Sequence, residues 1–236
     1  MAPPPVQTKS LPGSGARFQG ILPPIVGRPV FTIRKKALKV FTIEDYVSQG
    51  VMTAEQARII REAVMARQNI LISGGTGSGK TTLANAILAL IAETKDRVVI
   101  LEDTQELQCQ AEDVVALRTK DGTCSMRDLL KATMRLRPDR IVIGEVRGPE
   151  ALDLLKAWNT GHPGGCATVH ADSAEKALSR LQQLVQEAGI NASRLLIEDT
   201  IDVVLYIEKN STKRRVSQLF AIRKIRPTPK YHSGKP

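Results

Sequence analysis

The chain has 236 residues, of which 42% are hydrophobic and 25% are charged, and it carries a formal net charge of +10. No run approaches the roughly 18 to 20 apolar residues that a membrane-spanning helix needs, and the first residues lack the apolar stretch of a signal peptide. These features exclude a helical membrane protein and predict a globular, cytoplasmic protein with a packed core.

The beginning of the chain predicts a lead-in that precedes the folded domain. Residues 1–29 are rich in Pro, Gly and Ser, a composition typical of extended or disordered segments. Val30–Ile33 predicts a strand, and we interpret residues 41–49 as a connector. Thr53 and Gln56 have the spacing of a capping box, so we expect a helix to begin directly after Thr53.

A glycine-rich loop is the most informative motif of the sequence. Gly74, Gly79, Lys80 and Thr81 satisfy the pattern G-x-x-x-x-G-K-[ST], between a short apolar strand and a helical pattern. In such a loop the backbone N–H groups converge on phosphate oxygens, the lysine reaches the β- and γ-phosphates, and the next hydroxyl ligates Mg²⁺. The alternative is a glycine-rich loop that binds no nucleotide. The predicted ATP-binding residues are Gly74, Gly75, Thr76, Gly77, Ser78, Gly79, Lys80, Thr81 and Thr82.

Strands and helices alternate along the chain around this loop. The expected strands are residues 69–73, 97–101, 114–117, 140–144, 166–169, 202–207 and 216–222, and the expected helices lie near residues 80–93, 125–136, 151–158 and 174–185. This alternation predicts an α/β protein whose mostly parallel sheet has helices on both faces. Ligands of such sheets bind beyond the carboxyl ends of the strands, so polar residues that follow a strand are candidates for chemistry.

Three polar side chains follow predicted strands in this way. Glu102 could orient or deprotonate an attacking water, and Glu145 follows an apolar strand as a Walker B acid does, where it could hold Mg²⁺ through a water. His170 could hydrogen-bond the γ-phosphate. Each has a simpler alternative, because acids after strands often cap the next helix and a single histidine is often structural. Their occurrence together with the glycine-rich loop favours the catalytic interpretation.

The excess positive charge gathers at the C-terminus, where residues 209–236 contain no acid. The basic residues there are Lys209, Lys213, Arg214, Arg215, Arg223, Lys224, Arg226, Lys230 and Lys235. Such a tail could contact nucleic acid, an anionic membrane surface or an acidic partner. A solvated tail is the simpler alternative.

The cysteines are assigned no function. Cys109, Cys124 and Cys166 are odd in number and lack the spacing of metal ligands. We therefore expect small buried side chains and neither disulfides nor a zinc site.

Four motifs in this order resemble the secretion, or traffic, ATPases of type II and type IV systems. They are the glycine-rich loop, Ile100–Asp103 (an Asp box), Arg140–Arg147 (Walker B), and Thr160–Gly165 with Ala167–Ala171 (a His box). Within that family, three stretches look most like the TrbB-type conjugal transfer ATPases: Leu117–Gly122, Arg135–Arg140 and Glu150–Trp158. The resemblance extends from about residue 17 to residue 207.

The resemblance implies a RecA-like P-loop motor domain that follows a separate N-terminal domain and forms a hexameric ring, with ATP at the domain and subunit boundaries. It implies that Glu102 is the catalytic carboxylate, Glu145 the Walker B acid near Mg²⁺, and His170 a γ-phosphate sensor, with His162 nearer the interface. Basic residues at the end of the N-terminal domain act on phosphate in such proteins, and Arg17 and Arg34 are the candidates here. The implied output is conjugative pilus biogenesis or DNA–protein export at the inner membrane face.

The resemblance also predicts how the chain divides. Residues 1–40 would hold a disordered lead-in, a remnant of the N-terminal domain and a linker, residues 41–208 the RecA-like ATPase domain, and residues 209–236 a basic strand and tail. Only the last stretch of the family's N-terminal domain, roughly residues 17–36, is matched. We therefore expect a truncated, mis-started or reduced chain. Nucleotide binding by the glycine-rich loop should survive, and ring assembly and full ATPase activity are the properties that the missing part puts in question.

Three other functions stay open at this point. A type IV pilus or type II secretion motor would use the same chemistry, and paired zinc cysteines would favour it. A nucleic-acid-dependent RecA-like ATPase is compatible with the basic tail, although the His box does not indicate it. A non-catalytic nucleotide-binding subunit that only scaffolds a ring is the third.

Overall fold

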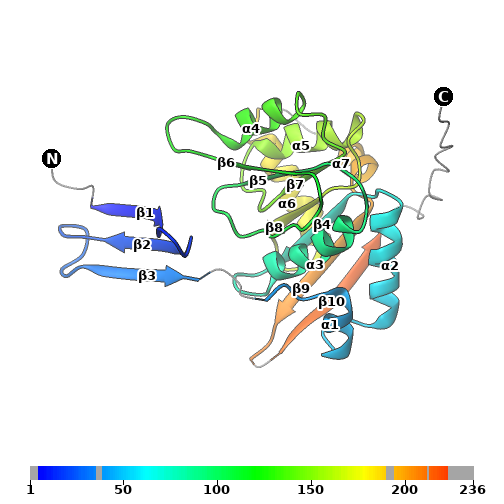
Figure 1. Ribbon diagram of the computed structural model, residues 1–236, viewed down its shortest axis with the longest axis horizontal. Helices are drawn as coiled ribbons and strands as arrows, with labels where there is room; N and C mark the ends of the chain where they lie inside the picture. Colours follow the sequence, from blue (N-terminus) through cyan, green and yellow to red (C-terminus); the bar gives the residue numbers. More distant parts are fainter. Residues whose placement is uncertain (1–4, 36–38, 190–193, 212, 223–236) are drawn as a thin grey trace. The chain divides into compact units, whose positions relative to one another are not determined.

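The computed structural model describes residues 5–35, 39–189, 194–211 and 213–222, and the chain divides into two units (Figure 1). The first unit comprises residues 1–39 with residues 104–106. The second comprises residues 40–103 and 107–236 and contains the glycine-rich loop. Of the C-terminal basic tail, residues 223–236 lie outside the described residues.

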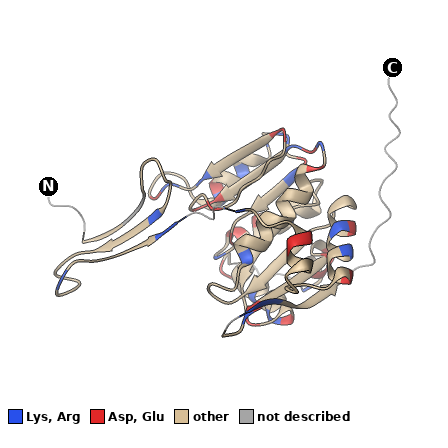
Figure 2. Ribbon diagram, turned by 60° about the horizontal axis from the view of Figure 1, so that its bottom comes forward, with Lys and Arg blue, Asp and Glu red and all other residues tan. Residues whose placement is uncertain are grey.

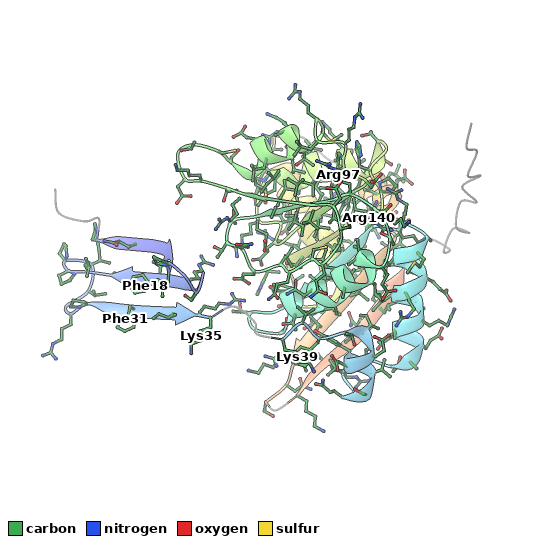
Figure 3. All side chains as sticks on the ribbon, in the orientation of Figure 1. Phe18, Phe31, Lys35, Lys39, Arg97 and Arg140 are labelled. Carbon is green, nitrogen blue, oxygen red and sulfur yellow. The ribbon has the colours of Figure 1, made fainter. Side chains whose placement is uncertain are left out.

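The first unit is a three-stranded antiparallel sheet in the order β1-β2-β3. Its strands are β1 (Val6–Ser10), β2 (Arg17–Ile21) and β3 (Val30–Arg34), so the strand predicted at residues 30–33 is confirmed. Two strands replace the lead-in predicted before it. The prolines at positions 12, 23, 24 and 29 all lie between strands, where their missing N–H groups interrupt no ladder. Phe18 and Phe31 stack across β2 and β3, with ring centroids 6.0 Å apart (Figure 3).

The second unit is built on a seven-stranded sheet in the order β10-β9-β4-β8-β7-β5-β6. Its strands are β4 (Ile70–Gly74), β5 (Val98–Glu102), β6 (Val114–Arg118), β7 (Arg140–Ile143), β8 (Cys166–His170), β9 (Val203–Lys209) and β10 (Arg214–Ala221). Neighbouring strands from β9 to β6 are parallel, and β10 returns antiparallel to β9. The expected α/β class with a mostly parallel sheet is confirmed.

Helices cover both faces of this sheet, as predicted (Figure 1). They are α1 (Ile43–Ser48), α2 (Ala54–Met65), α3 (Lys80–Ala92), α4 (Met126–Thr133), α5 (Glu150–Asn159), α6 (Ala174–Gln186) and α7 (Arg194–Thr200). Side chains alternate along each strand, so Leu71 packs with α4 to α7 while Ile70 and Ile72 pack with α1 to α3. The two hydrophobic layers therefore hold the sheet between them and fix the ends of its strands.

Capping boxes begin helices α1, α2 and α4. The predicted box of Thr53 and Gln56 is present at α2. A second box, formed by Thr42 and Asp45, opens α1 in the stretch that we interpreted as a connector. Helix α1 has six residues, which is too short to show a helical period in the sequence.

The three cysteines are free thiols. Cys166 is fully buried in β8, and burial raises the pKa of its thiol to about 12. Cys109 and Cys124 are half-buried. The expectation of a small buried side chain is therefore confirmed for Cys166, and only in part for the other two.

Arg140 is a buried ion-pair residue at the start of β7 (Figure 3). Its Nε lies 2.6 Å from Asp96 Oδ2, and its Nη1 donates to the carbonyl oxygens of Val64 and Gly164 at 3.0 and 2.9 Å. Burial alone would raise the pKa of Asp96, but the hydrogen bond and charge of Arg140, with the charge of Arg67, hold that pKa below its usual value. These contacts tie the amino end of β7 to α2 and to the entry of β8.

Replacing Arg140 by methionine is expected to lower the free energy of unfolding by about 3 kcal/mol, because it leaves a half-buried carboxylate and two buried carbonyls without their donor. Urea unfolding measures the loss. A carboxyl whose folded-state pKa is depressed stabilises the protein above its unfolded pKa and loses that effect as the pH falls through the folded value. The difference in the free energy of unfolding between the variant and the wild type should therefore become smaller below about pH 4.

The matched control is Arg97→Met. Arg97 Nη1 pairs with Asp113 Oδ2 at 3.1 Å on the surface, so this change should cost less than about 1 kcal/mol. Equal losses in the two variants, or a difference that does not change with pH, would contradict the stabilising role assigned to the buried pair.

Candidate nucleotide-binding site

The glycine-rich loop joins the carboxyl end of β4 to the amino end of α3. Its backbone requires glycine at two points. A Cβ on Gly74 would lie 2.3 Å from the carbonyl oxygen of Ile207, and Gly79 has a φ of +106°, which L side chains rarely adopt. Helix α3 then begins at Lys80 with no side-chain cap on its first N–H groups. Backbone donors and the positive end of the helix dipole are thus available together at this point.

The side chains of the loop add further donors to these backbone N–H groups. Lys80 Nζ lies 2.8 Å from the carbonyl oxygen of Gly74 and 3.1 Å from that of Gly75, so the ammonium is held over the mouth of the loop. The Ser78 hydroxyl is buried and has no hydrogen-bond partner among the described residues. Thr81 and Thr82 are half-buried in the first turn of α3. A triphosphate fits this arrangement, because it would supply anionic acceptors for every one of these donors.

The register of the sheet brings the other predicted residues to the same edge as the loop. Gly74 is the register partner of His170 across β4 and β8, and Leu101 is the partner of Ile143 across β5 and β7. Leu101 is followed by Glu102, which ends β5. Ile143 is followed by Gly144 and then by Glu145. The glycine-rich loop and the three predicted polar residues therefore lie along one edge of the sheet, at the carboxyl ends of the strands.

Glu102 is a buried carboxylate with a defined position. Its relative exposure is 4%, and its Oε1 accepts a hydrogen bond from the backbone N–H of Leu107 at 2.8 Å. A Cβ on Gly144 would lie 3.0 Å from Glu102 Cγ, so the glycine before Glu145 makes room for this side chain. The two acids are thereby adjacent at the ends of β5 and β7.

Glu145 is paired with a residue to which the sequence analysis gave no role. Arg147 Nε donates to Glu145 Oε2 at 2.8 Å, and Arg147 Nη1 lies 3.6 Å from Asp103 Oδ2. Arg147 thus links the acid that follows β7 to the second acid of the Asp box. The signal available in the sequence was its position two residues after Glu145.

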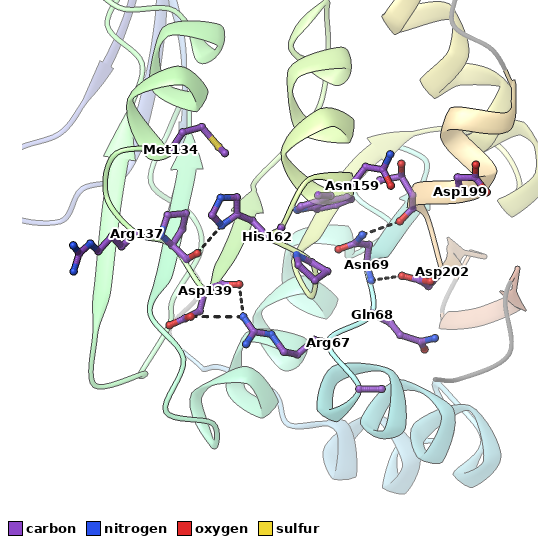
Figure 4. A pocket seen from close by; sticks show the side chains of 16 residues that line it. Arg67, Gln68, Asn69, Met134, Arg137, Asp139, Asn159, His162, Asp199 and Asp202 are labelled. Atoms are coloured by element: carbon purple, nitrogen blue, oxygen red, sulfur yellow. Dashed lines mark hydrogen bonds and ion pairs between the residues drawn. The ribbon is translucent and has the colours of Figure 1, made fainter. Parts of the chain in front are cut away.

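The two histidines of the His box lie at opposite ends of β8. His170 ends the strand beside Gly74, whereas His162 precedes the strand, and its Nδ1 lies 2.8 Å from the carbonyl oxygen of Pro138 (Figure 4). His162 lines a pocket of about 710 Å³ that also includes Asn69 and Asp139, at the amino ends of β4, β7 and β8. Of the two, only His170 is at the edge that holds the glycine-rich loop.

Arg17 and Arg34 belong to the first unit. They are register partners across β2 and β3, and Arg34 Nη2 forms an ion pair with Glu106 Oε2 at 3.0 Å. Their predicted action on nucleotide phosphates stays a prediction.

The described residues hold no cluster of three His, Cys, Asp or Glu side chains able to bind a metal ion. A divalent cation at this edge would instead have the Thr81 hydroxyl and the Glu145 carboxylate as protein donors. Mg²⁺ is usually held in this way, by one or two protein oxygens together with phosphates and water. None of the helices in the residues that the structure describes has the length and apolar character of a membrane-spanning segment.

Comparisons with known proteins find similar sequences and a similar solved structure. The family model described as "Type II/IV secretion system protein" matches residues 17–220. Conjugal transfer protein TrbB of Rhizobium radiobacter is 54% identical over 220 residues, which cover 92% of this chain and 68% of that protein. Type IV secretion system protein PtlH of Bordetella pertussis is 35% identical over 254 residues, covering 92% of this chain and 74% of the relative. The crystal structure of the VirB11 ATPase from the Brucella suis type IV secretion system, in complex with sulphate, aligns with a TM-score of 0.65 and 28% identity, covering 92% of this chain and 74% of that one.

Proposed function

Because the chain belongs to the type II/IV secretion system protein family, we propose that it is an ATPase whose hydrolysis of ATP powers a type IV secretion or conjugative transfer apparatus, in pilus biogenesis or in DNA–protein export. The observation that carries the proposal is the phosphate loop at the end of β4, with Glu102, Glu145 and His170 along the same edge of the sheet. The similarity to TrbB and PtlH supports the assignment to conjugation and type IV secretion.

Each residue of this edge has a role in the proposed reaction. Lys80 and the backbone N–H groups of the loop neutralise charge on the β- and γ-phosphates. Glu102 orients and deprotonates the attacking water, and its burial next to Gly144 keeps it at one position. His170, beside Gly74, hydrogen-bonds the γ-phosphate and is sensitive to its loss.

Mg²⁺ is the proposed cofactor, with Thr81 as a direct ligand and Glu145 as a ligand through water. When bound, the cation supplies electrostatic stabilisation to the phosphate oxygens. Glu145 is also the acceptor of the Arg147 hydrogen bond. Arg147 therefore restricts the orientation of the carboxylate that would hold the cation through water.

The proposed working form is a hexameric ring associated with the cytoplasmic face of the inner-membrane secretion machinery. Arg17 and Arg34 of the first unit would reach the phosphates on closure and complete the site. The basic residues at the C-terminus are the proposed contact with membrane or nucleic acid. A type IV pilus or type II secretion motor is the alternative output, since those motors would use the same chemistry.

The proposal predicts that specific activity rises as the ring forms. ATP turnover of the purified chain is measured against protein concentration, with mass by light scattering in the same samples. Turnover per subunit is expected to increase with the fraction of high-mass species, because residues from neighbouring subunits would complete each site. A chain that binds ATP but stays monomeric and inert would contradict the proposed ring motor, and a ring that binds ATP without hydrolysing it would indicate the non-catalytic scaffolding subunit. Steep, salt-dependent stimulation by single-stranded DNA would favour the nucleic-acid-dependent ATPase.

A further inference from the structure

Arg214, the first residue of β10, lies against the glycine-rich loop although 135 positions separate it from Gly79 in the sequence. A Cβ on Gly79 would be 3.2 Å from Arg214 Cδ and 3.4 Å from Arg214 Nε. The stem of the arginine therefore covers the glycine that precedes Lys80. Arg214 is exposed, so its guanidinium is accessible to a ligand on the loop. It is one of four basic residues at the β9–β10 turn, with Lys209, Lys213 and Arg215, visible as blue ribbon in Figure 2.

The order of the strands gives a direction to a nucleotide on the loop. Strand β4 lies between β8 on one side and β9 on the other. The acids Glu102 and Glu145 follow β5 and β7, which lie on the β8 side. In the proposed reaction the γ-phosphate faces that side, because the water that Glu102 activates attacks it there. The nucleoside, at the other end of the triphosphate, then extends toward β9 and β10, where Arg214 lies.

Strand β10 contacts the segment that follows α1. Tyr46 of α1 is buried and contacts Phe41 edge-to-face, with centroids 6.4 Å apart. Burial raises the pKa of the Tyr46 hydroxyl, and the positive charge of Arg214 partly opposes that rise. The N–H of Val216 donates to the carbonyl of Val51 at 2.7 Å, so β10 is fastened to the segment between α1 and α2.

We propose that Arg214 is a nucleoside-binding residue, whose guanidinium stacks on the adenine ring of ATP bound to the loop. The inference rests on the proposed ATPase function and adds the residue that recognises the base. A guanidinium is planar and weakly hydrated, so it stacks on aromatic faces in a way that an ammonium does not. Its stem already lies against Gly79, which limits the freedom lost on binding.

The test is calorimetric titration of wild type, Arg214→Ala and Arg214→Lys with ATP, with ADP and with inorganic tripolyphosphate. Arg214→Ala is expected to weaken ATP and ADP by about tenfold each, because both carry the base, and to leave tripolyphosphate unchanged. Arg214→Lys should bind ATP and ADP nearly as weakly as Arg214→Ala does, since lysine keeps the positive charge but lacks the planar guanidinium that stacks on the base. In turnover assays KM should rise with kcat unchanged, as for an interaction made equally in the ground and transition states.

Arg215→Ala is the matched control. Arg215 is the next residue, points to the opposite side of β10, and is the register partner of Glu208, so its loss should change none of these affinities. Because Arg214 and Arg215 are both exposed, neither change should alter the thermal midpoint.

Four results would overturn the inference. They are unchanged affinities in Arg214→Ala, an equal loss for tripolyphosphate, a loss for ATP without one for ADP, and full rescue by lysine. All four leave ATP binding by the wild type in place, so they would remove the proposed base contact and leave the proposed ATPase function standing. A wild type that binds neither nucleotide would remove both.

Discussion

Replacing Lys80 by alanine is expected to abolish ATP hydrolysis and to weaken ATP binding strongly. The Lys80 ammonium is held over the carbonyls of Gly74 and Gly75, at the mouth of the loop where the β- and γ-phosphates would lie. Losing one positioned donor to the charge that develops in the transition state typically costs a factor of about 10² to 10³ in rate. The ground-state phosphates also lose this cation, so KM should rise as well as kcat fall.

Steady-state turnover and calorimetric binding measure the two effects separately. Lys95→Ala is the matched control, because Lys95 is an exposed lysine just beyond the other end of the same helix, and its loss should leave both quantities unchanged. Unchanged turnover in Lys80→Ala would be incompatible with the phosphate-binding role of the loop.

The position of the predicted site residues, at the carboxyl ends of the strands, was predictable because it depends on short sequence patterns. Each of Gly74, Glu102, Glu145 and His170 follows an apolar run that is long enough to form a buried strand, and parallel strands bring such ends to one edge. The period of the apolar residues and the capping residues then place the longer helices.

The features that the sequence did not reveal depend on contacts between distant segments. Strands β1 and β2 lie in a Pro-rich stretch and are strands because each pairs with a neighbour, which composition does not record. Arg214 and Gly79 are far apart in the sequence and meet only because β9 lies beside β4. His162 and His170 belong to one motif, yet the length of β8 separates them to opposite ends of the sheet.

Replacing Glu102 by glutamine is expected to give a protein that binds ATP but does not hydrolyse it. The amide oxygen of glutamine can still accept the hydrogen bond from the Leu107 N–H, and the side chain keeps the shape that Gly144 accommodates. The fold and the phosphate loop should therefore be unaffected. Only the capacity to take a proton from water is lost, and general-base catalysis contributes a factor of about 10² to 10⁴.

Single-turnover hydrolysis and ATP affinity are measured for Glu102→Gln, for Glu145→Gln, and for Glu112→Gln as the control at an exposed acid of the loop before β6. Because Glu145 is proposed to act through Mg²⁺, its variant should lose activity in a way that higher Mg²⁺ concentration partly restores. The Glu102 defect should not respond to Mg²⁺, since no cation replaces a missing base. Normal turnover in Glu102→Gln would move the base elsewhere, and Glu145, the adjacent acid at the end of β7, would be the first position to examine.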